Sequence, residues 1–320
     1  MAIISGNIKE AAKLLEDGFV ISIPTETVYG LAGNAFNHEV VAKIFEIKNR
    51  PHFNPLIIHS NSIDKIAQFA EITGSALKLA QKFWPGPLTL LVPKKPIVSD
   101  LITAGYSTVA VRIPGHPLTL QLLELIDFPL AAPSANPFGY VSPTIPEHVE
   151  SQLGNEIPYI LDGGPCSIGL ESTIAGFDED DNLVIYRVGG LPVEELEMET
   201  GKKAIYLNDI EKLPKTPGML KSHYATKTPL VIGKVNTLMN NFRHDKIGVI
   251  SLKTIYPDIP IFQQMELSQT GDLNEAARNL FSAMRKLDAM GLEVIIAEKF
   301  PEEGLGRAIN DRLMKAAHVG

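Results

Sequence analysis

Cysteine is nearly absent from this 320-residue sequence, which contains only Cys166. A single cysteine cannot form an internal disulfide, and Cys166 lacks the neighbouring ligands of a zinc site. Its simplest interpretation is a small buried apolar residue. Long apolar runs are absent too: no stretch approaches the ~18 residues that a membrane span needs, and the start of the chain has no signal-peptide pattern. We therefore expect a cytoplasmic protein without a membrane partner.

Basic residues are scarce in the first two thirds of the chain. Residues 1–206 contain 14 Lys and Arg against 24 Asp and Glu, a net charge of −10, whereas residues 207–320 carry +2. A protein that is held on nucleic acid mainly by phosphate neutralisation needs a basic face. We therefore expect no stable nucleic-acid binding, and each cation of the first part becomes informative about a ligand.

Several familiar catalytic motifs are missing as well. The chain has no G-x-x-x-x-G-K-[ST], no G-x-G-x-x-G after a first strand, no G-x-S-x-G and no H-E-x-x-H. These absences argue against a P-loop, a dinucleotide fingerprint, a serine nucleophile elbow and a zinc hydrolase. The cations, hydroxyls and glycine turns that are present favour binding of an anionic nucleotide and catalysis by positioning and charge stabilisation.

The hydrophobic pattern predicts an α/β protein with two domains, which the length also favours. In residues 1–206 we expect helices near 7–18, 38–48, 63–83, 116–126 and 146–153, and strands at 19–24, 55–59, 88–93, 108–114, 128–135, 159–164, 171–177 and 182–188. Residues 207–228 show no sustained hydrophobic period, which predicts a linker. Residues 229–320 predict a smaller Rossmann-like unit with a parallel sheet, with strands at 229–233, 246–252 and 292–300 and helices near 272–290 and 306–317.

Two polar stretches follow or precede predicted strands and could carry chemistry. "IPTETVYGLAG", residues 23–33, runs from a strand into a turn with Thr25, and ligands collect at strand ends in α/β sheets. "KNRPHFNPL" places Lys48, Arg50 and His52 beside two prolines, which would hold the cations in place for an anion. A hydroxyl-capped turn and a solvated turn remain the structural alternatives.

Two further stretches are rich in small residues. "APSANPFGYVSPT", residues 132–144, leads into a predicted helix, so Ser134, Asn136 and Ser142 could complete a phosphate cradle at its N-terminus. "LDGGPCSIGLESTI", residues 161–174, is a glycine-rich turn that a ligand could approach closely or that could be purely structural. Two lone strand-end cations, Arg112 and Arg187, need an anionic partner, which is either a protein carboxylate or a substrate.

Taken together, these stretches resemble the YrdC-type family. "FWPGPLTLLV" and "TVAVRIPGHPL" add to the match in family order, and "TPGMLKSHYA" and "GLGRAINDRLMKAA" resemble the longer, two-domain members. The resemblance covers nearly the whole chain. It implies a YrdC-like open twisted mixed sheet with helices over residues 1–206, an active-site lid in 207–228, and a small C-terminal α/β domain over 229–320.

The resemblance also implies an activity, because the long members are threonylcarbamoyl-AMP synthases. These nucleotidyltransferases condense L-threonine, bicarbonate or CO₂, and ATP, and release pyrophosphate, with Mg²⁺ expected on the ATP phosphates. The product serves the N6-threonylcarbamoyladenosine modification of tRNAs that read A-starting codons, and a separate complex makes that transfer. Two other readings, an RNA-binding module and a carbamoyl-transfer maturation factor, compete with it. The second expects zinc-finger and acylphosphatase-like segments, which do not fit into this chain.

The same resemblance implies roles for individual residues. Threonine would be bound by Thr25, His59, Arg112, Ala132 and Ser172, and ATP by Lys48, Arg50, His52, Thr108, Ser134, Asn136, Ser142, Arg187 and Tyr224. The catalytic set would be Lys48, Arg50 and Arg112. Tyr224 would fold back over the pocket and make the linker a lid.

Overall fold

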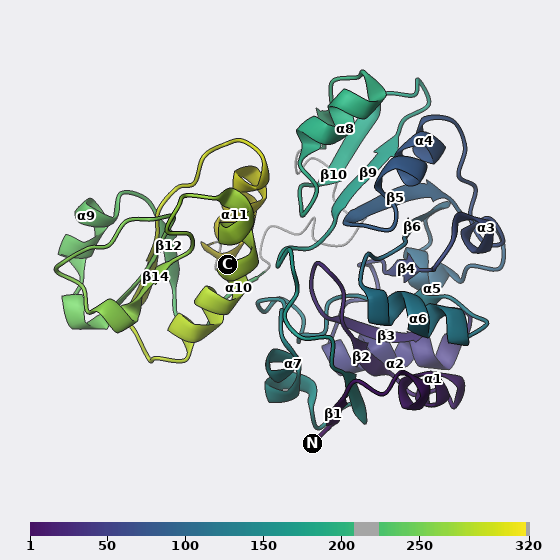
Figure 1. Cartoon of the computed structure of the whole chain (residues 1–320), viewed down its shortest axis with the longest axis horizontal. Coiled ribbons are helices and arrows are strands. Elements are labelled where there is room, and N and C mark those ends of the chain that lie inside the picture. The colour runs from purple at the N-terminus through teal and green to yellow at the C-terminus, as the bar shows by residue number, and fades with distance from the viewer. Residues whose placement is uncertain (208–223, 318–320) are drawn as a thin grey trace.

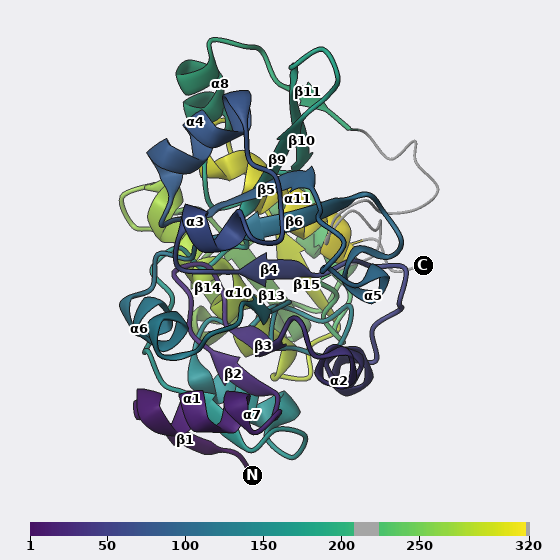
Figure 2. The ribbon, with the colours of Figure 1, turned by 90° about the vertical axis from the view of Figure 1, so that its right-hand side faces the viewer.

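The larger sheet follows from a series of short, apolar strands. The computed structural model describes residues 1–207 and 224–317, and eleven strands of the first range form one mixed sheet in the order β1-β8-β2-β3-β7-β4-β6-β5-β9-β10-β11 (Figure 2). They are β1 (Ile3–Ser5), β2 (Ile21–Ile23), β3 (Gly30–Asn34), β4 (Ile57–His59), β5 (Leu88–Pro93), β6 (Thr108–Arg112), β7 (Leu130–Ala131), β8 (Tyr159–Leu161), β9 (Thr173–Phe177), β10 (Leu183–Arg187) and β11 (Ile205–Tyr206). The predicted mixed sheet is confirmed.

Helices cover this sheet, and those predicted near 7–18, 38–48, 116–126 and 146–153 are confirmed. They are α1 (Ile8–Glu16), α2 (His38–Lys48), α3 (Ile63–Ile66), α4 (Gly74–Phe83), α5 (Asp100–Thr103), α6 (Pro117–Leu125), α7 (Pro146–Leu153) and α8 (Val193–Thr200). Asn7 caps α1, because its side chain accepts hydrogen bonds from the amides of Lys9 and Glu10. The single helix predicted over 63–83 is wrong: Ala70 pairs with Lys94 in a β-bridge, which separates α3 from α4.

The C-terminal unit contains a four-stranded sheet whose neighbouring strands are all parallel, as predicted. Its order is β12-β15-β13-β14, made from β12 (Leu230–Ile232), β13 (Ile247–Ser251), β14 (Gln264–Glu266) and β15 (Val294–Ala297). Its helices are α9 (Val235–Leu238), α10 (Leu273–Asp288) and α11 (Leu305–Ala317), with short 3₁₀ turns η1 (Met239–Asn241), η2 (His244–Lys246) and η3 (Ile261–Gln263). Figure 1 shows α10 and α11 between this sheet and the larger domain.

The two domains share apolar contacts. Val28, Val141 and Leu170 of the larger domain belong to the same buried cluster as the inner faces of α10 and α11. Gly169 shows how closely the backbones approach, because a Cβ atom there would lie 2.5 Å from the Cα atom of Arg278 in α10. This packing fixes the C-terminal helices against the loop that precedes β9.

Two expectations concern segments rather than packing. Among the described residues no helix is long and apolar enough to cross a membrane, and α10, the longest, has 16 residues. The predicted lid over 207–228 lies largely outside the described residues, which resume at Tyr224.

Cys166 is buried, as its sequence context suggested, and burial raises the pKa of its thiol to about 12.

Candidate active site

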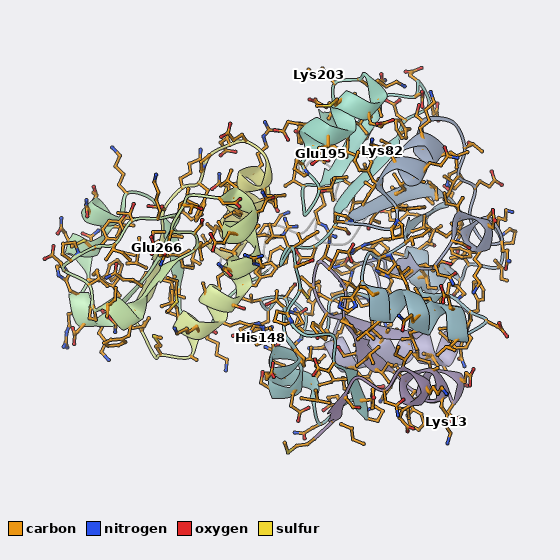
Figure 3. The ribbon with its side chains drawn as sticks, in the orientation of Figure 1. Lys13, Lys82, His148, Glu195, Lys203 and Glu266 are labelled. Atoms are coloured by element: carbon orange, nitrogen blue, oxygen red, sulfur yellow. The ribbon has the colours of Figure 1, made fainter. Side chains whose placement is uncertain are left out.

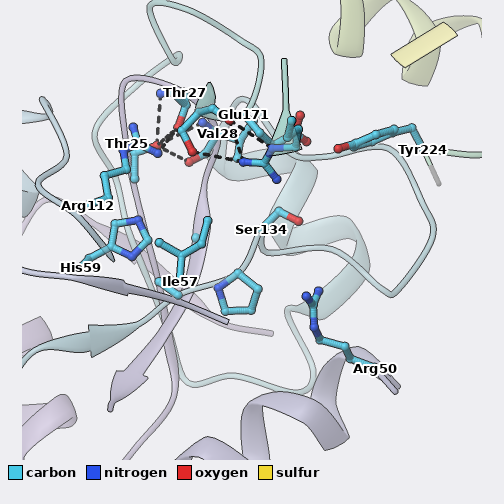
Figure 4. A pocket seen from close by; sticks show the side chains of 15 residues that line it. Thr25, Thr27, Val28, Arg50, Ile57, His59, Arg112, Ser134, Glu171 and Tyr224 are labelled. Carbon is cyan, nitrogen blue, oxygen red and sulfur yellow. Dashed lines mark hydrogen bonds between the residues drawn. The ribbon is translucent and has the colours of Figure 1, made fainter. Parts of the chain in front are cut away.

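One pocket collects residues from most of the stretches that the sequence singled out (Figure 4). The space inside it that water-sized molecules can reach is about 50 Å³, and the pocket is partly open to solvent. Its lining consists of Thr25, Thr27, Val28, Gly30, Arg50, Ile57, His59, Arg112, Ala132, Pro133, Ser134, Glu171, Ser172, Arg187 and Tyr224. In Figure 4, Thr25, His59 and Arg112 lie along one side, and Arg50 and Tyr224 along the other.

Thr25 shapes the turn between β2 and β3. Its Oγ1 accepts hydrogen bonds from the amides of Thr27 and Val28, each at 3.1 Å, and contacts the Thr27 hydroxyl at 2.7 Å. A threonine hydroxyl that binds the backbone two and three residues on is a common turn device. The turn therefore presents buried hydroxyl groups to the pocket. Thr25 both caps this turn, which was the structural alternative for the stretch, and lines the pocket.

His59 and Arg112 meet because β4 and β6 are parallel neighbours. The two residues are register partners at the carboxyl ends of their strands, which is where α/β sheets collect ligands. Burial and the nearby Arg112 charge lower the pKa of His59 to about 3, so its imidazole is neutral at pH 7. Its Nδ1 atom is buried and has no hydrogen-bond partner within the described parts of the chain.

Arg112 has a protein carboxylate as its partner. Its Nη2 donates to Glu26 Oε1 at 2.7 Å, its Nη1 to Thr27 Oγ1 at 3.0 Å, and its Nε to the Gly86 carbonyl at 3.1 Å. These contacts use three of the five guanidinium N–H donors. Of the two partners that the sequence left open, the carboxylate is therefore present, and two donors remain for a ligand.

Ser172 immediately precedes β9, and Arg187 ends the adjacent strand β10. Arg187 Nη2 donates to the Ser172 carbonyl at 2.9 Å and to its Oγ at 3.1 Å, and the Ser172 hydroxyl lies 2.7 Å from Thr89 Oγ1. Gly189 permits this approach, since a Cβ atom there would lie 2.3 Å from the Glu171 carbonyl oxygen. The two residues form one wall of the pocket.

Arg50 is held by the loop that carries it. Its Nε donates to the Asn54 carbonyl at 3.0 Å, and its Nη2 to Asn54 Oδ1 at 2.6 Å and to the Pro55 carbonyl at 2.7 Å. Every one of these acceptors is a neutral oxygen. Burial and then the charge of Arg187 lower the pKa of Arg50 to about 9, which leaves it a cation at pH 7. Its Nη1 donates no hydrogen bond to the described residues and can bind an anion.

Lys48 does not line the pocket. It is 1% exposed, and its Nζ donates to the carbonyls of Ser134 and Asn136 at 2.5 Å each. Burial, followed by the charge of Arg50, holds the pKa of its amine well below the usual value. Lys48 therefore fixes the backbone of the segment that carries Ser134, which does line the pocket.

Four other residues expected on the nucleotide side are not among the lining residues. Thr108 lies at the opposite end of β6 from Arg112. His52 is exposed, and its ring packs on Phe45 of α2 at 5.0 Å between centroids. Asn136 and Ser142 are buried behind the pocket, where Asn136 Nδ2 donates to two carbonyls of its own loop and Ser142 Oγ donates to Glu171 at 2.5 Å.

Tyr224 reaches the pocket through contacts with the C-terminal domain. Its ring stacks on Phe281 of α10 at 5.6 Å between centroids, and the guanidinium of Arg312 in α11 lies 5.0 Å from it. Arg312 Nε also donates to Glu171 Oε2 at 2.8 Å. Figure 3 shows side chains filling the space between the two domains, with His148 where α7 faces α10.

Four polar or charged residues at or beside the pocket had no assigned role in the sequence: Glu26, Thr27, Glu171 and Arg312. Glu26 and Glu171 were visible as acids inside the quoted motifs, each next to an assigned residue. Arg312 also left a signal, because it lies on the apolar stripe of α11 with Ile309 and Leu313. A cation on an apolar stripe needs a buried partner.

The described residues contain no group of three or more His, Cys, Asp or Glu side chains that could hold a metal ion. Glu171, the single carboxylate that lines the pocket within the described ranges, is engaged by Arg312 and Ser142. The donor set near the pocket thus consists mainly of guanidinium and hydroxyl groups, which suit an anionic ligand.

Comparisons with known proteins cover nearly the whole chain. Residues 13–189 match the Sua5/YciO/YrdC family model, described as "Telomere recombination", and residues 191–318 match "Threonylcarbamoyl-AMP synthase, C-terminal domain". The threonylcarbamoyl-AMP synthase of Pyrococcus abyssi is 42% identical over 97% of this chain and 94% of its own, and that of Bacillus subtilis 41% over 97% and 92%.

Solved structures give the same picture. Pyrococcus abyssi Sua5 complexed with L-threonine superposes with a TM-score of 0.91 at 40% identity, covering 99% of this chain and 98% of that one. E. coli YciO, at 20% identity, covers 59% of this chain and 96% of its own with a TM-score of 0.53, and shows the fold alone.

Fold and pocket thus define a two-domain α/β protein with an arginine-lined small-molecule site. The chain belongs to the Sua5/YciO/YrdC family, in its long form with the threonylcarbamoyl-AMP synthase C-terminal domain.

Proposed function

We propose that the chain is a threonylcarbamoyl-AMP synthase that condenses L-threonine, bicarbonate or CO₂, and ATP. One observation carries the proposal: a single pocket places His59 and Arg112 on one side and Arg50 on the other, in a chain that two synthases match over nearly its whole length. The first side suits an amino acid with its carboxylate. The second suits the phosphates of a nucleotide.

On the amino-acid side, the donors that Arg112 has left would bind the threonine carboxylate. Thr25 and Ser172 present hydroxyl groups, and Ala132 presents its backbone. His59 has a pKa of about 3 and is a poor base at pH 7. Its buried Nδ1 would therefore accept a hydrogen bond from threonine rather than remove a proton.

The reaction needs no protein nucleophile. The nitrogen of neutral threonine forms a bond to the carbon of CO₂ and loses a proton to solvent, which gives a carbamate. A carbamate oxygen then bonds to the α-phosphorus of ATP, and the bond to pyrophosphate breaks. Arg50 and Arg187 would stabilise the phosphate charge, and Ser134 would contact the nucleotide.

Other parts of the chain would support this chemistry indirectly. Lys48, Asn136 and Ser142 would position the pocket wall, while Tyr224 would close the nucleotide side. Mg²⁺ would arrive with ATP and neutralise phosphate charge. Its main ligands would be phosphate oxygens, because the described residues contain no cluster of acidic side chains that could hold a metal ion. The enzyme would act in the cytoplasm and pass its product to a separate tRNA-modifying complex.

The test is pyrophosphate release from the purified full-length chain with ATP, bicarbonate and a set of amino acids. We expect release that depends on both threonine and bicarbonate, together with a product that has the mass of threonylcarbamoyl-AMP. Serine and valine are matched controls, since each lacks one of the two groups on the threonine side chain. Pyrophosphate release that is independent of threonine would overturn the proposed function.

A further inference from the structure

Arg312 is the largest fully buried side chain of the described structure, and it comes from the C-terminal domain. It lies on α11, on the helix face that also buries Ile309 and Leu313. A buried charge is costly unless it is paired and hydrogen-bonded. The contacts of Arg312 therefore show what this charge is there to hold.

The guanidinium contacts three parts of the pocket wall. Its Nε donates to Glu171 Oε2 at 2.8 Å, its Nη2 donates to the Val188 carbonyl at 3.0 Å, and it lies 5.0 Å from the ring centre of Tyr224. Within α11, it also pairs with Asp311. Glu171 precedes Ser172, and Val188 follows Arg187. One side chain of the C-terminal domain thus contacts two pocket residues directly, Glu171 and Tyr224, together with Val188, the immediate neighbour of the pocket residue Arg187.

Glu171 is a buried anion with two arginines near it. Burial by itself would raise the pKa of its carboxyl, but the charges of Arg312 and Arg187 and the hydrogen bond from Ser142 lower this pKa to about 2. One carboxylate oxygen accepts from Arg312 and the other from Ser142. Among the described residues, Arg187 is the other cation whose charge lowers the pKa of this carboxyl, and Arg187 donates to Ser172.

We propose that Arg312 is a positioning residue of the active site, which pairs with Glu171 so that Arg187 stays on Ser172 and keeps its charge directed at the substrate anion. This inference rests on the proposed function. The C-terminal domain then supplies an electrostatic component of the site, because the carboxylate it neutralises belongs to the catalytic domain.

Arg312→Met in the full-length chain tests the inference. The methionine retains much of the apolar stem and removes the charge, and we expect the KM for ATP to rise about 10-fold with a smaller change in the KM for threonine. Arg307→Met is the matched control, because Arg307 is on the same helix and pairs with Glu194 of the larger domain at 3.1 Å, but does not line the pocket. We expect the control to remain within about 2-fold of the unmodified chain. Equal KM values for ATP in the two variants would overturn the inference.

A second variant separates charge from packing. Arg312→Met combined with Glu171→Gln removes the released carboxylate, so the KM for ATP should return to within about 3-fold of the unmodified chain. If Arg312 only filled space, the double variant would be no better than the single one, and this result would also overturn the inference.

The test does not depend on the folding of one variant. If circular dichroism shows that Arg312→Met is unfolded, the double variant and Arg312→Lys replace it, and a 10-fold or larger rise in the KM for ATP in both would contradict the inference. Failure of the proposed function has a different signature, since the unmodified chain would then lack threonine-dependent pyrophosphate release.

Discussion

The two sides of the pocket hold their arginines in different ways. Arg112, on the side we assign to threonine, donates to the carboxylate of Glu26, whereas Arg50, on the opposite side, is held by neutral oxygens of Asn54 and Pro55. A carboxylate cancels much of the guanidinium charge, and a carbonyl does not. The difference indicates that the first side orients a small ligand through geometry, while the second retains charge for a polyanion.

The strongest test of this comparison is removal of the cation held by neutral oxygens. Arg50→Ala should lower kcat/KM for ATP by about 1,000-fold, equivalent to about 4 kcal/mol, because its charge has no carboxylate partner among its hydrogen-bond contacts and is available to the phosphates. Steady-state pyrophosphate release measures it. Lys43→Ala, which removes an exposed cation of α2 from its pair with Glu46, should change activity less than 2-fold. A loss below 10-fold for Arg50→Ala would break the comparison.

On the threonine side, we expect loss of the carboxylate partner to lower the stability of the protein. Glu26→Gln leaves the buried Arg112 charge without its carboxylate, so we expect the free energy of unfolding to fall by about 3 kcal/mol in urea denaturation. Glu46→Gln removes the carboxylate of the exposed pair with Lys43 and should cost less than about 0.5 kcal/mol. Similar losses in both variants would show that the buried pair is not special.

The pH dependence of stability sharpens the description of the threonine side. The folded state keeps the His59 pKa at about 3, whereas the unfolded chain takes up a proton below about pH 6.5. The unfolded state therefore binds more protons, and this contribution to stability is complete above pH 6.5 and is lost as the pH falls toward 3. One proton corresponds to about 1.4 kcal/mol per pH unit.

His148, with a pKa lowered to about 4 by burial and then by the Arg285 charge, acts in the same direction. Urea unfolding between pH 6.5 and 5 should therefore give His59→Asn a slope that is smaller than that of the unmodified chain by about one proton. An unchanged slope would mean that His59 titrates alike in the folded and unfolded states.

The smallest effect is expected at His52. Its side chain is exposed and packs on Phe45, away from the residues that line the pocket. His52→Ala should keep kcat/KM for ATP within about 2-fold. A loss comparable to that of Arg50→Ala would restore His52 to the nucleotide side, where its place in the sequence had suggested it.

The sequence was informative wherever a site residue ends a strand. His59 and Arg112 follow apolar runs, and the parallel register of β4 and β6 makes them neighbours. Strand β3 was missed because two of its residues are glycines, and Gly33 is required by packing: a Cβ atom there would lie 2.4 Å from Val40 of α2. Propensity carries no information about such a contact.

Long-range contacts explain the remaining differences between the site predicted from the sequence and the site in the structure. A lysine in a basic loop is a typical phosphate-binding residue. The amine of Lys48 instead donates to two carbonyls that lie 86 and 88 residues away in the sequence. Arg312 pairs with a carboxylate 141 residues away in the other domain. A single sequence shows that such cations need a partner, but it does not show which partner the fold provides.

The burial of Lys48 keeps its amine away from a reactive product. A carbamoyl adenylate is a mixed anhydride, and it acylates free amines. Every permanent cation among the described lining residues is an arginine, whose guanidinium is a poor nucleophile, while the amine of Lys48 lies behind the wall with two carbonyls as partners. The described part of the site can thus make and hold an acylating agent without presenting it a lysine to modify.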